Sequence, residues 1–558
     1  MKRLVWILLC VLLLTTQLCP ANAATAEEPV TLKVFFTGAI SGSGTPSGIQ
    51  TDPVAMDILD KIGVQLDFHP ETTTEAFLLM LAGGDLPDLV MIEDQKFIGQ
   101  MIRGNLIQPM DELLDQYGAD ILKNAPEKVE FSRAQFSDGT DKLYYLPVAS
   151  GPGMVNDTYT FGLNVRWDLY KQLGYPEIKT YTDIIDIVEK MLALEPVNEN
   201  GQKNYGFSFN SDWDGMTALY TLMLAPLYGY DTTEHDFHAE INDAEGYAVE
   251  DIFREDSWMF KGAEFLFEMN QRGLLDTDSM SQTWDNVSEK IKAGRVMLSF
   301  VYWPLPSYND LQVSAGNPLK GYMPLYPQDS TTMWQFGDEP YGLTSGWVIS
   351  RNCQRPDKAM QFLNYIHSID GATTIFSGVE GTHWSLQDGV PSMTESTYQE
   401  KLSDPNFAMV TGVGKYYNAS GLNAWTINPR FNESLQYLSW QTTRERFYSD
   451  LWKDYDAHFG VDAPYQAYDL QRTKDVRSDP YRAFMGVMPD EIAVINQRIS
   501  DMARTEMYKM IFAADRSEFD AVKQDIIRTA NELGLQQELD WVREERAKAQ
   551  KLYEEYAK

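Results

Sequence analysis

Oxygen-bearing side chains with the spacing of metal ligands occur in one loop. Asn198-Glu199-Asn200-Gly201-Gln202-Lys203-Asn204 alternates such side chains around a glycine, as Ca²⁺ loops do, and Asn198, Asn200, Gln202 and Asn204 are the candidate ligands. Pro196 stands where the first acidic ligand belongs, and no glutamate closes a loop of about 12 residues. A plain turn is therefore the alternative interpretation.

Other metal or catalytic chemistry has little support in the residue types. The six His and three Cys include no His-Glu-x-x-His or Cys-x-x-Cys spacing, and there is no Gly-x-Ser-x-Gly elbow or phosphate-binding glycine loop. Acidic residues number 81, however, and a glycosidase needs only two carboxylates about 5–10 Å apart in space. An extracellular polysaccharide-degrading enzyme that uses paired carboxylates therefore stays open as an alternative.

Aromatic side chains are the most abundant candidates for ligand recognition. The chain has 13 Trp, 30 Tyr and 26 Phe, which together make up 12% of its residues. Part of this aromatic surface must form the core, because aromatic rings bury large apolar areas. Tryptophan at this frequency also suits a site that stacks on planar or sugar-ring ligands.

The composition is that of a folded, acidic protein. With 558 residues, 44% hydrophobic and 23% charged, the chain is long enough for two to four globular units and can bury a core without disulfides or metals. The formal net charge of −35 repels phosphate backbones and anionic lipid. This charge excludes nucleic acid as a partner.

The N-terminus has the order of a secretory signal peptide. Lys2 and Arg3 precede an apolar run at 4–14, and Ala21-Asn22-Ala23 offers a cleavage site after Ala23. The apolar run has about 11 residues, fewer than the ~18–20 that a membrane-spanning helix needs. We therefore expect export of residues 24–558 to a periplasmic or extracellular location.

Cysteine usage argues against a lipid anchor and an internal disulfide. Cys10 and Cys19 leave with the signal peptide, and each follows a leucine instead of the small residue that a lipoprotein signal requires. Cys353 is then the one cysteine of the mature chain, and it is expected to be a buried small hydrophobe.

Strand and helix patterns alternate in the first part of the mature chain. Val30–Phe36 is β-branched and alternating, and a glycine- and serine-rich loop follows at 38–48. The spacing then predicts helix 52–62, strand 64–68, helix 73–82 and strand 89–92. This βαβ order predicts a parallel, doubly wound sheet.

A second unit begins near residue 161 and the α/β pattern later resumes. The predicted elements are strand 161–165, helices 168–173 and 183–194, strands 295–300 and 347–350, and helix 356–366. The C-terminal third is mostly helical, with amphipathic helices predicted at 515–533 and 539–556.

Three stretches together carry a family resemblance. They are Leu81-Ala82-Gly83-Gly84-Asp85-Leu86-Pro87-Asp88-Leu89-Val90, then Lys142–Pro147 with Asn164–Gly174, and finally Ile349–Cys353 with Pro356–Ala359 and Gly378–Trp384. In these stretches the chain resembles the carbohydrate-type extracellular solute-binding proteins of ABC importers, in particular the long subfamily related to LipO-type lipoproteins. The missing lipoprotein signal is a departure from that pattern.

The resemblance implies an α/β two-lobe type II periplasmic-binding-protein fold. Its sheets would be mixed but mainly parallel and flanked by helices, with a helix-rich C-terminal part. The implied division places 24–148 and 325–370 in the first lobe, and 149–324 and 371–558 in the second. The implied function is capture of an oligosaccharide and its delivery to membrane permease subunits, by a monomer that has no catalytic residues and no cofactor, apart from a possible Ca²⁺. A secreted adhesin or signalling partner with the same fold is a further alternative.

Candidate ligand-binding residues follow from this architecture. Asp94 comes just after the strand at 89–92, on the side where ligands of parallel sheets bind, although it could instead cap a helix. Trp303 follows the buried strand near 300, and the family's matching segment lines the cleft. Trp347 and Trp384 could face the hinge. Core packing is the alternative for all three tryptophans.

Two further tryptophans and one arginine complete the candidate set. Trp213 and Trp425 have polar neighbours in the sequence, which favours exposed rings that contact a ligand. Arg430 could bind a uronate carboxylate through a bidentate fork, whereas an ion pair within the protein is the alternative. Trp440 and Trp541 lie in amphipathic runs and are expected to be core residues.

Overall fold

The structure is a computed structural model of the chain. It describes residues 29–556 except for 38–39, 42–43, 71–73, 94, 154–160, 213–222, 232–237, 243–245, 336–337, 344, 465, 471–473, 478–480 and 487. The expected signal peptide, 1–23, lies outside the described residues. None of the described helices combines the length and the hydropathy of a membrane-spanning segment.

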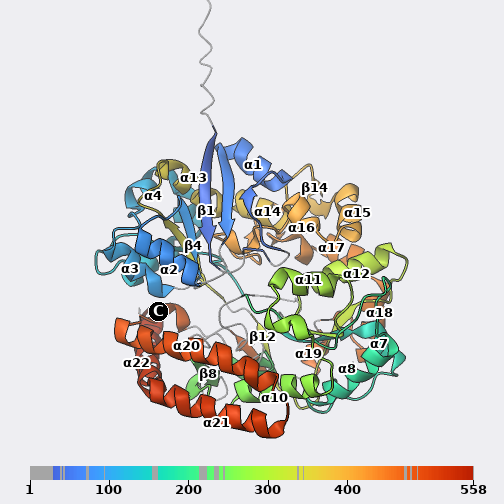
Figure 1. The fold of residues 1–558 in the computed structure, drawn as a ribbon. Coiled ribbons are helices and arrows are strands. Elements are labelled where there is room, and N and C mark those ends of the chain that lie inside the picture. Colours follow the sequence, from blue (N-terminus) through green and yellow to red (C-terminus); the bar gives the residue numbers. More distant parts are fainter. Residues whose placement is uncertain are drawn as a thin grey trace, which may run out of the picture.

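The first lobe contains a six-stranded sheet in the order β2-β3-β1-β4-β13-β5 (Figure 1). Strands β3, β1 and β4 are parallel, as the βαβ pattern predicts, whereas β13 runs antiparallel to both of its neighbours. The strands are β1 (Val30–Phe36), β2 (Gly48–Ile49), β3 (Val64–Pro70), β4 (Leu89–Ile92), β5 (Leu146–Pro147) and β13 (Gly346–Ile349).

Helices cover both faces of this sheet because its strands are apolar on both sides. Val34 and Phe36 of β1 belong to one core and Phe35 to the other. The helices are α1 (Pro53–Ile62), α2 (Thr74–Gly83), α3 (Ile98–Arg103), α4 (Asp111–Tyr117), α5 (Ala119–Asn124), α6 (Pro126–Gln135) and α13 (Pro356–Ile366), with the 3₁₀ turn η1 (Gln95–Phe97).

The second lobe contains a three-stranded sheet in the order β10-β6-β11. Both outer strands run antiparallel to β6, so the expected parallel pairing is found in the first lobe and not in this sheet. Smaller sheets join β7 to β8 and β9, and β12 to β18. The strands are β6 (Phe161–Arg166), β7 (Tyr230–Asp231), β8 (Ala239–Asn242), β9 (Ala248–Asp251), β10 (Leu298–Val301), β11 (Tyr322–Leu325), β12 (Thr332–Gln335) and β18 (Lys474–Arg477).

Helices from the middle and the end of the chain enclose this second core. Leu163 and Val165 of β6 pack in one cluster with Met507, Ile526 and Leu539. The helices are α7 (Trp167–Gln172), α8 (Asp183–Leu194), α10 (Trp258–Gln271), α11 (Trp284–Lys292), α12 (Leu305–Ser314), α18 (Asp450–Phe459), α19 (Gln466–Asp469), α20 (Asp490–Ile511), α21 (Arg516–Leu533) and α22 (Leu535–Tyr556), with 3₁₀ turns η2 (Ala225–Tyr228) and η5 (Thr277–Met280). The 3₁₀ turn η8 (Arg482–Phe484) and the later part of α22 pack on the first lobe instead, because Phe484 and Val542 share a core with Phe35.

Residues 369–447 pack on the first lobe, whereas the sequence-based division places all residues after 370 in the second. Ala372, Ile375 and Phe376 share a core with β1, and Lys415 Nζ lies 2.9 Å from Asp52 Oδ2 at the start of α1. The segment comprises α14 (Ile369–Ser377), β14 (Trp384–Gln387), β15 (Val390–Met393), α15 (Glu395–Ser403), α16 (Phe407–Thr411), η6 (Tyr417–Ala419), β16 (Ile427–Asn428), β17 (Glu433–Ser434), η7 (Tyr437–Ser439) and α17 (Gln441–Phe447). Figure 1 shows this segment beside α1, above the second lobe.

Candidate functional site

The carboxyl ends of β1 and β4 lie at the edge of the first sheet that faces the second lobe (Figure 1). Thr37 follows β1 and Glu93 follows β4. The N–H of Glu93 donates to Thr37 Oγ1 at 3.0 Å, and the N–H of Thr37 donates to Met91 O at 3.1 Å. The Glu93 side chain is exposed. Because ligands of parallel sheets bind beyond the carboxyl ends of the strands, this edge is the first half of the candidate site.

The second half lies where β10 ends. Val301, the last residue of β10, pairs with Phe161, the first residue of β6, so β10 ends at the side from which the chain enters this lobe. Trp303 follows two residues later and is half-buried. Its ring centroid lies 5.7 Å from that of Trp284 at the start of α11, with an interplanar angle of 51°. The end of β10 therefore presents the half-buried ring of Trp303, which packs on the buried ring of Trp284.

A carboxylate lies beside this aromatic pair. Asp212 Oδ1 accepts the backbone N–H of Trp284 at 3.0 Å and the side-chain amide of Asn210 at 2.8 Å. Asn210 is buried, whereas Asp212 is partly exposed. These bonds fix the orientation of the carboxylate next to the aromatic rings. The combination of rings and a carboxylate is suited to hydroxylated ring ligands, because C–H faces pack on indole and hydroxyls donate to carboxylate oxygen.

The chain crosses between the lobes after β5, before β13 and after α17, and described residues of the first two crossovers pair with each other. Gly151 and Glu339 exchange backbone hydrogen bonds of 3.0 and 2.9 Å, and Leu343 N–H donates to Val148 O at 2.9 Å. The third crossover is the short link between α17 and α18 at 448–449. Such a set of extended and short connections is the usual form of a hinge.

The loop at 420–426 packs on the first crossover and carries Trp425. Ser150 N–H donates to Gly421 O at 3.1 Å, and Asn423 N–H donates to Ser150 O at 2.8 Å. Asn423 Oδ1 in turn accepts the N–H of Trp425 at 2.8 Å. Gly151 has a φ of +149°, and a Cβ there would lie 2.6 Å from Thr426 Oγ1, so this close approach requires glycine. Trp425 is half-buried beside the hinge.

Trp347 and Trp384 are core residues in this structure. Their exposed fractions are 0% and 2%. The indole N–H of Trp347 donates to Ala419 O at 3.0 Å, and that of Trp384 donates to Gly378 O at 2.8 Å. With the rings covered and the donors satisfied, neither tryptophan presents a face to a ligand here. Trp440 is also fully buried, as the sequence predicts, and Trp541 is partly buried.

Arg430 directs its guanidinium fork at a carboxylate of the protein itself. Its Nη1 and Nη2 lie 2.8 and 3.0 Å from the two Glu380 oxygens, and both side chains are exposed. The hydrogen bonds from Arg430 lower the pKa of the Glu380 carboxyl. The ion-pair interpretation therefore accounts for Arg430 in this structure. Asp94 and Trp213 lie outside the described residues.

A family model described as bacterial extracellular solute-binding protein matches residues 61–373, which is more than half of the chain. The chain belongs to this family. No curated protein matches the chain in sequence.

Solved structures similar to this solute-binding protein share its two-lobe α/β fold. The alginate-binding protein AlgQ2 without calcium has a TM-score of 0.62 at 16% identity, covering 93% of this chain and 98% of its own. FusA of S. pneumoniae with kestose has a TM-score of 0.55 at 16% identity, with 95% and 99% covered. NgtS of Streptococcus pneumoniae with Man1GlcNAc has a TM-score of 0.55 at 12% identity, with 93% and 99% covered.

The candidate Ca²⁺ loop of this solute-binding protein is a turn closed by its own side chains. Asn198 Oδ1 accepts the N–H groups of Asn200 and Gln202 at 3.0 and 2.9 Å, and its amide donates to Gln202 Oε1 at 2.9 Å. Asn204 donates its side-chain N–H to the carbonyl of Glu195, which precedes the loop. Because the loop's first oxygen already accepts two backbone donors, the geometry matches the turn interpretation.

A cation of the protein sits beside this loop. Lys320 Nζ lies 2.8 Å from Glu199 Oε1 and 3.7 Å from Glu195 Oε2. Glu195 also pairs with the buried Arg166 at 3.0 Å. Among the residues that the structure describes, no group of three or more His, Cys, Asp and Glu is arranged to hold a metal ion. The donor set therefore does not fit Ca²⁺ in this structure.

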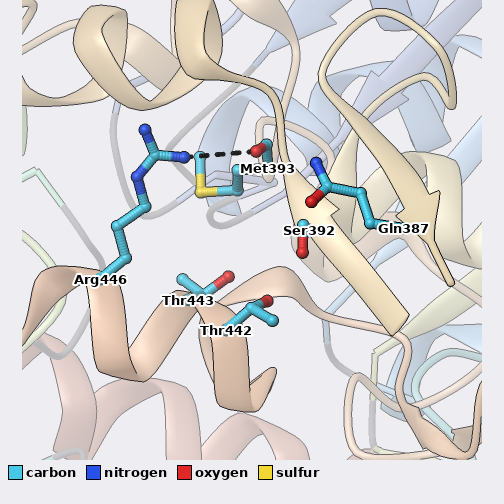
Figure 2. A pocket seen from close by; sticks show the side chains of 6 residues that line it. All are labelled: Gln387, Ser392, Met393, Thr442, Thr443 and Arg446. Carbon is cyan, nitrogen blue, oxygen red and sulfur yellow. Dashed lines mark hydrogen bonds between the residues drawn. The ribbon is translucent and has the colours of Figure 1, made fainter. Parts of the chain in front are cut away.

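Figure 2 shows a small pocket of about 130 Å³ between β14, β15 and α17. Its lining residues are Gln387, Ser392, Met393, Thr442, Thr443 and Arg446. Arg446 donates to Met393 O at 3.4 Å and also pairs with Glu395. Binding sites for drug-sized ligands occupy about 300–1,000 Å³, so this pocket is too small for an oligosaccharide.

Asp212, Asn210 and the packing of the Trp425 loop on the hinge were not predicted from the sequence. Asp212 stands next to Trp213 in a polar run, Asn210-Ser211-Asp212, but only the fold brings it to Trp284. No local sequence pattern indicates the contact between Asn423 and Ser150, because the two residues are 273 positions apart and only the fold brings them together.

Proposed function

We propose that this solute-binding protein captures an oligosaccharide between its two lobes and delivers it to the permease of an ABC transporter, without chemical change. Membership of the extracellular solute-binding family supports capture of a solute. The similar structures support the carbohydrate class, since they are an alginate-binding protein and complexes with kestose and with Man1GlcNAc.

The observation that carries the proposal is the pairing of Trp303 with Trp284 beside Asp212 at the end of β10. Sugar rings present apolar C–H faces, which would pack on the half-buried Trp303 ring. Their hydroxyls would donate to Asp212 and, across the lobes, to the exposed Glu93. Trp425 would contact the ligand from the hinge side.

Rotation about the crossovers would close the lobes on the ligand. Gly151 and Glu339 lie outside the helices and strands, so a change of a few backbone angles near them would move one lobe as a rigid body. The permease would then recognise the closed form. We further propose that residues 1–23 direct export, that the mature protein works as a monomer outside the cytoplasm, and that it needs no metal ion.

Two of the carboxylates with raised pKa values are committed to structural contacts and do not support the enzymatic alternative. Burial raises the pKa of Glu240 to about 7, and this side chain pairs with Arg254 at 2.9 Å and accepts the N–H of Met259. Burial also raises the pKa of Asp310, which pairs with Lys401 at 2.8 Å. Neither carboxylate is free to act as a general acid.

A thermal-shift screen of residues 24–558 against neutral and uronic-acid oligosaccharides tests the proposal. A ligand present at 100 times its Kd adds about 2.7 kcal/mol to the unfolding free energy, which raises Tm saturably. We expect one class of glycan to do so, and chromatography of the same mixtures to show the glycan unchanged. Release of new reducing ends would support the enzyme instead, and a shift only with peptides would overturn the carbohydrate assignment.

A further inference from the structure

A buried lysine lies beneath the hinge. Lys128, on α6, has a fully buried side chain. Its Nζ donates to the carbonyl oxygens of Pro147 and Gly421, each at 2.8 Å. Pro147 ends β5 just before the first crossover, and Gly421 lies in the loop that packs on that crossover. One ammonium group therefore joins two chain segments that are 274 positions apart.

The third partner of Lys128 is a buried histidine. His367 Nδ1 lies 2.6 Å from Leu363 O, so this nitrogen carries the proton and donates it to the carbonyl. The other ring nitrogen, Nε2, is then the acceptor for Lys128 Nζ at 2.9 Å. Gly421 packs against the same ring, because a Cβ at position 421 would lie 2.3 Å from His367 ring atoms.

No ion pair in the described part of the chain involves Lys128, and burial lowers its pKa well below the ordinary value. A buried amine without a carboxylate is costly unless its hydrogen bonds are made. The hydrogen bonds that the structure records for Lys128 Nζ go to the carbonyls of Pro147 and Gly421 at the hinge and to His367. An apolar side chain would leave those carbonyls without this donor.

The contacts continue from Lys128 to a candidate ligand residue. Gly421 O, besides Lys128, accepts both the N–H and the Oγ–H of Ser150 at 3.1 Å. Ser150 O accepts the N–H of Asn423, and Asn423 Oδ1 accepts the N–H of Trp425. The lysine, the first crossover and the Trp425 loop thus form one hydrogen-bonded unit.

We propose that Lys128 is a positioning residue for ligand binding, which holds the first crossover and the loop at 420–426 in the arrangement that presents Trp425 to the ligand. This inference rests on the proposed function for its effect on affinity. The geometry of the hinge segments can be tested independently of any ligand.

Lys128→Met keeps the length of the side chain and removes the amine. The matched control is Lys358→Met on α13, since Lys358 is also buried and donates to the carbonyl of Ile62 at 3.1 Å, but lies outside the hinge. Two quantities are measured for both variants: the Kd for the oligosaccharide that binds the wild type, and amide hydrogen exchange of 148–151 and 420–425. We expect Lys128→Met to raise Kd about tenfold and to speed exchange in both segments, while Lys358→Met changes neither by more than about twofold.

The two measurements separate failure of this inference from failure of the proposed function. If no oligosaccharide binds the wild type, the proposed function is wrong, and hinge exchange alone decides the role of Lys128. Equal exchange in the two variants, or equal Kd values, would overturn the inference. If Lys128→Met does not fold, Ser150→Ala removes one donor from the same Gly421 carbonyl and is expected to raise Kd and hinge exchange in the same direction by a smaller factor. A Ser150→Ala variant that matches the wild type in both would likewise overturn it.

Discussion

Lys401 Nζ lies 2.8 Å from Asp310 Oδ2, and this ion pair joins α15 on the first lobe to α12 in the second. The two side chains are only 11% and 12% exposed, and the Lys401 ammonium also lies 5.7 Å from the ring centroids of Phe407 and Phe447. The pair lies near the third crossover, where Leu451 N–H donates to Pro318 O shortly after α12. The lobes are therefore linked at this side as well as at Gly151.

Removing one partner of the Asp310–Lys401 pair should destabilise the protein strongly. Lys401→Met or Asp310→Asn leaves a buried charge without its partner, and we expect each to lower the unfolding free energy by about 3–5 kcal/mol. The double variant should lose less than the sum of the two, because it buries no unpaired charge. Denaturant unfolding measures all three. The control is Lys453→Met, which breaks the exposed Lys453–Asp450 pair and should lower the unfolding free energy by less than about 1 kcal/mol. If the double variant loses the sum of the two single losses, Asp310 and Lys401 are not coupled.

Chelation of divalent metal should leave the protein unchanged. Asn198 closes the loop at 198–204 through its own hydrogen bonds, and Lys320 pairs with Glu199. The side-chain oxygens of Asn198 and Glu199 are therefore already engaged and do not form a Ca²⁺ site in this structure. We expect the same Tm and the same Kd for glycan with EDTA and with added Ca²⁺. Lys320→Met should instead lower the unfolding free energy by about 1 kcal/mol, since it removes the cation from two carboxylates. A Ca²⁺-dependent rise in Tm would show that the loop rearranges to bind the ion.

Arg430→Gln should have little effect on stability or on affinity. The Arg430–Glu380 pair is exposed on both sides, and pairs of this kind contribute less than about 1 kcal/mol. Because Glu380 already occupies the guanidinium fork, we expect neutral and uronic-acid oligosaccharides to bind the variant as they bind the wild type. Titration calorimetry with one glycan of each class checks this. A selective loss of affinity for the uronic acid would mean that Arg430 leaves Glu380 to bind the ligand.

Glu240 should make stability fall as pH rises from about 4.5 to about 7. Burial raises its pKa in the folded state to about 7 from an ordinary value of 4.5, although Arg254 opposes the shift. The folded state then binds the proton more tightly, so this stabilisation is complete below about pH 4.5 and is lost as pH rises through about 7, by about 3 kcal/mol. Glu240→Gln has no proton to lose there, so the difference in unfolding free energy between variant and wild type should change with pH. A constant difference from pH 4.5 to 8 would contradict the shift.

The fold of the first lobe was accessible from the sequence because its signals are local. The alternation in β1, the proline at the first position of α1 and the glycine after it specify those elements within a few residues. In the second lobe, the predicted helix 183–194 has the same bounds as α8. The position of 369–447 was not accessible, since it depends on contacts such as Lys415 with Asp52, 363 positions away. Local patterns give no information about such contacts.

Burial decided which candidate residues can reach a ligand, and burial is a property of the whole fold. Trp347 and Trp303 both stand near a strand end in the sequence, yet Trp347 lies within β13 and is fully buried, while Trp303 lies two residues beyond β10 and stays half-buried. Arg430 was recognisable as a carboxylate-binding side chain, but the identity of its partner, Glu380, depends on how α14 and the loop after β16 pack together.

The most direct test of oligosaccharide capture is titration calorimetry of the wild type, Trp303→Ala and Trp452→Ala with the glycan that shifts Tm. Trp452, on α18, is the matched control because it is half-buried against the same core. We predict saturable binding of one glycan per chain to the wild type, about 30-fold weaker binding to Trp303→Ala, which corresponds to a loss of about 2 kcal/mol, and unchanged affinity for Trp452→Ala. Equal affinity of Trp303→Ala and the wild type would contradict the proposed site, and absence of binding by the wild type would contradict the proposed function.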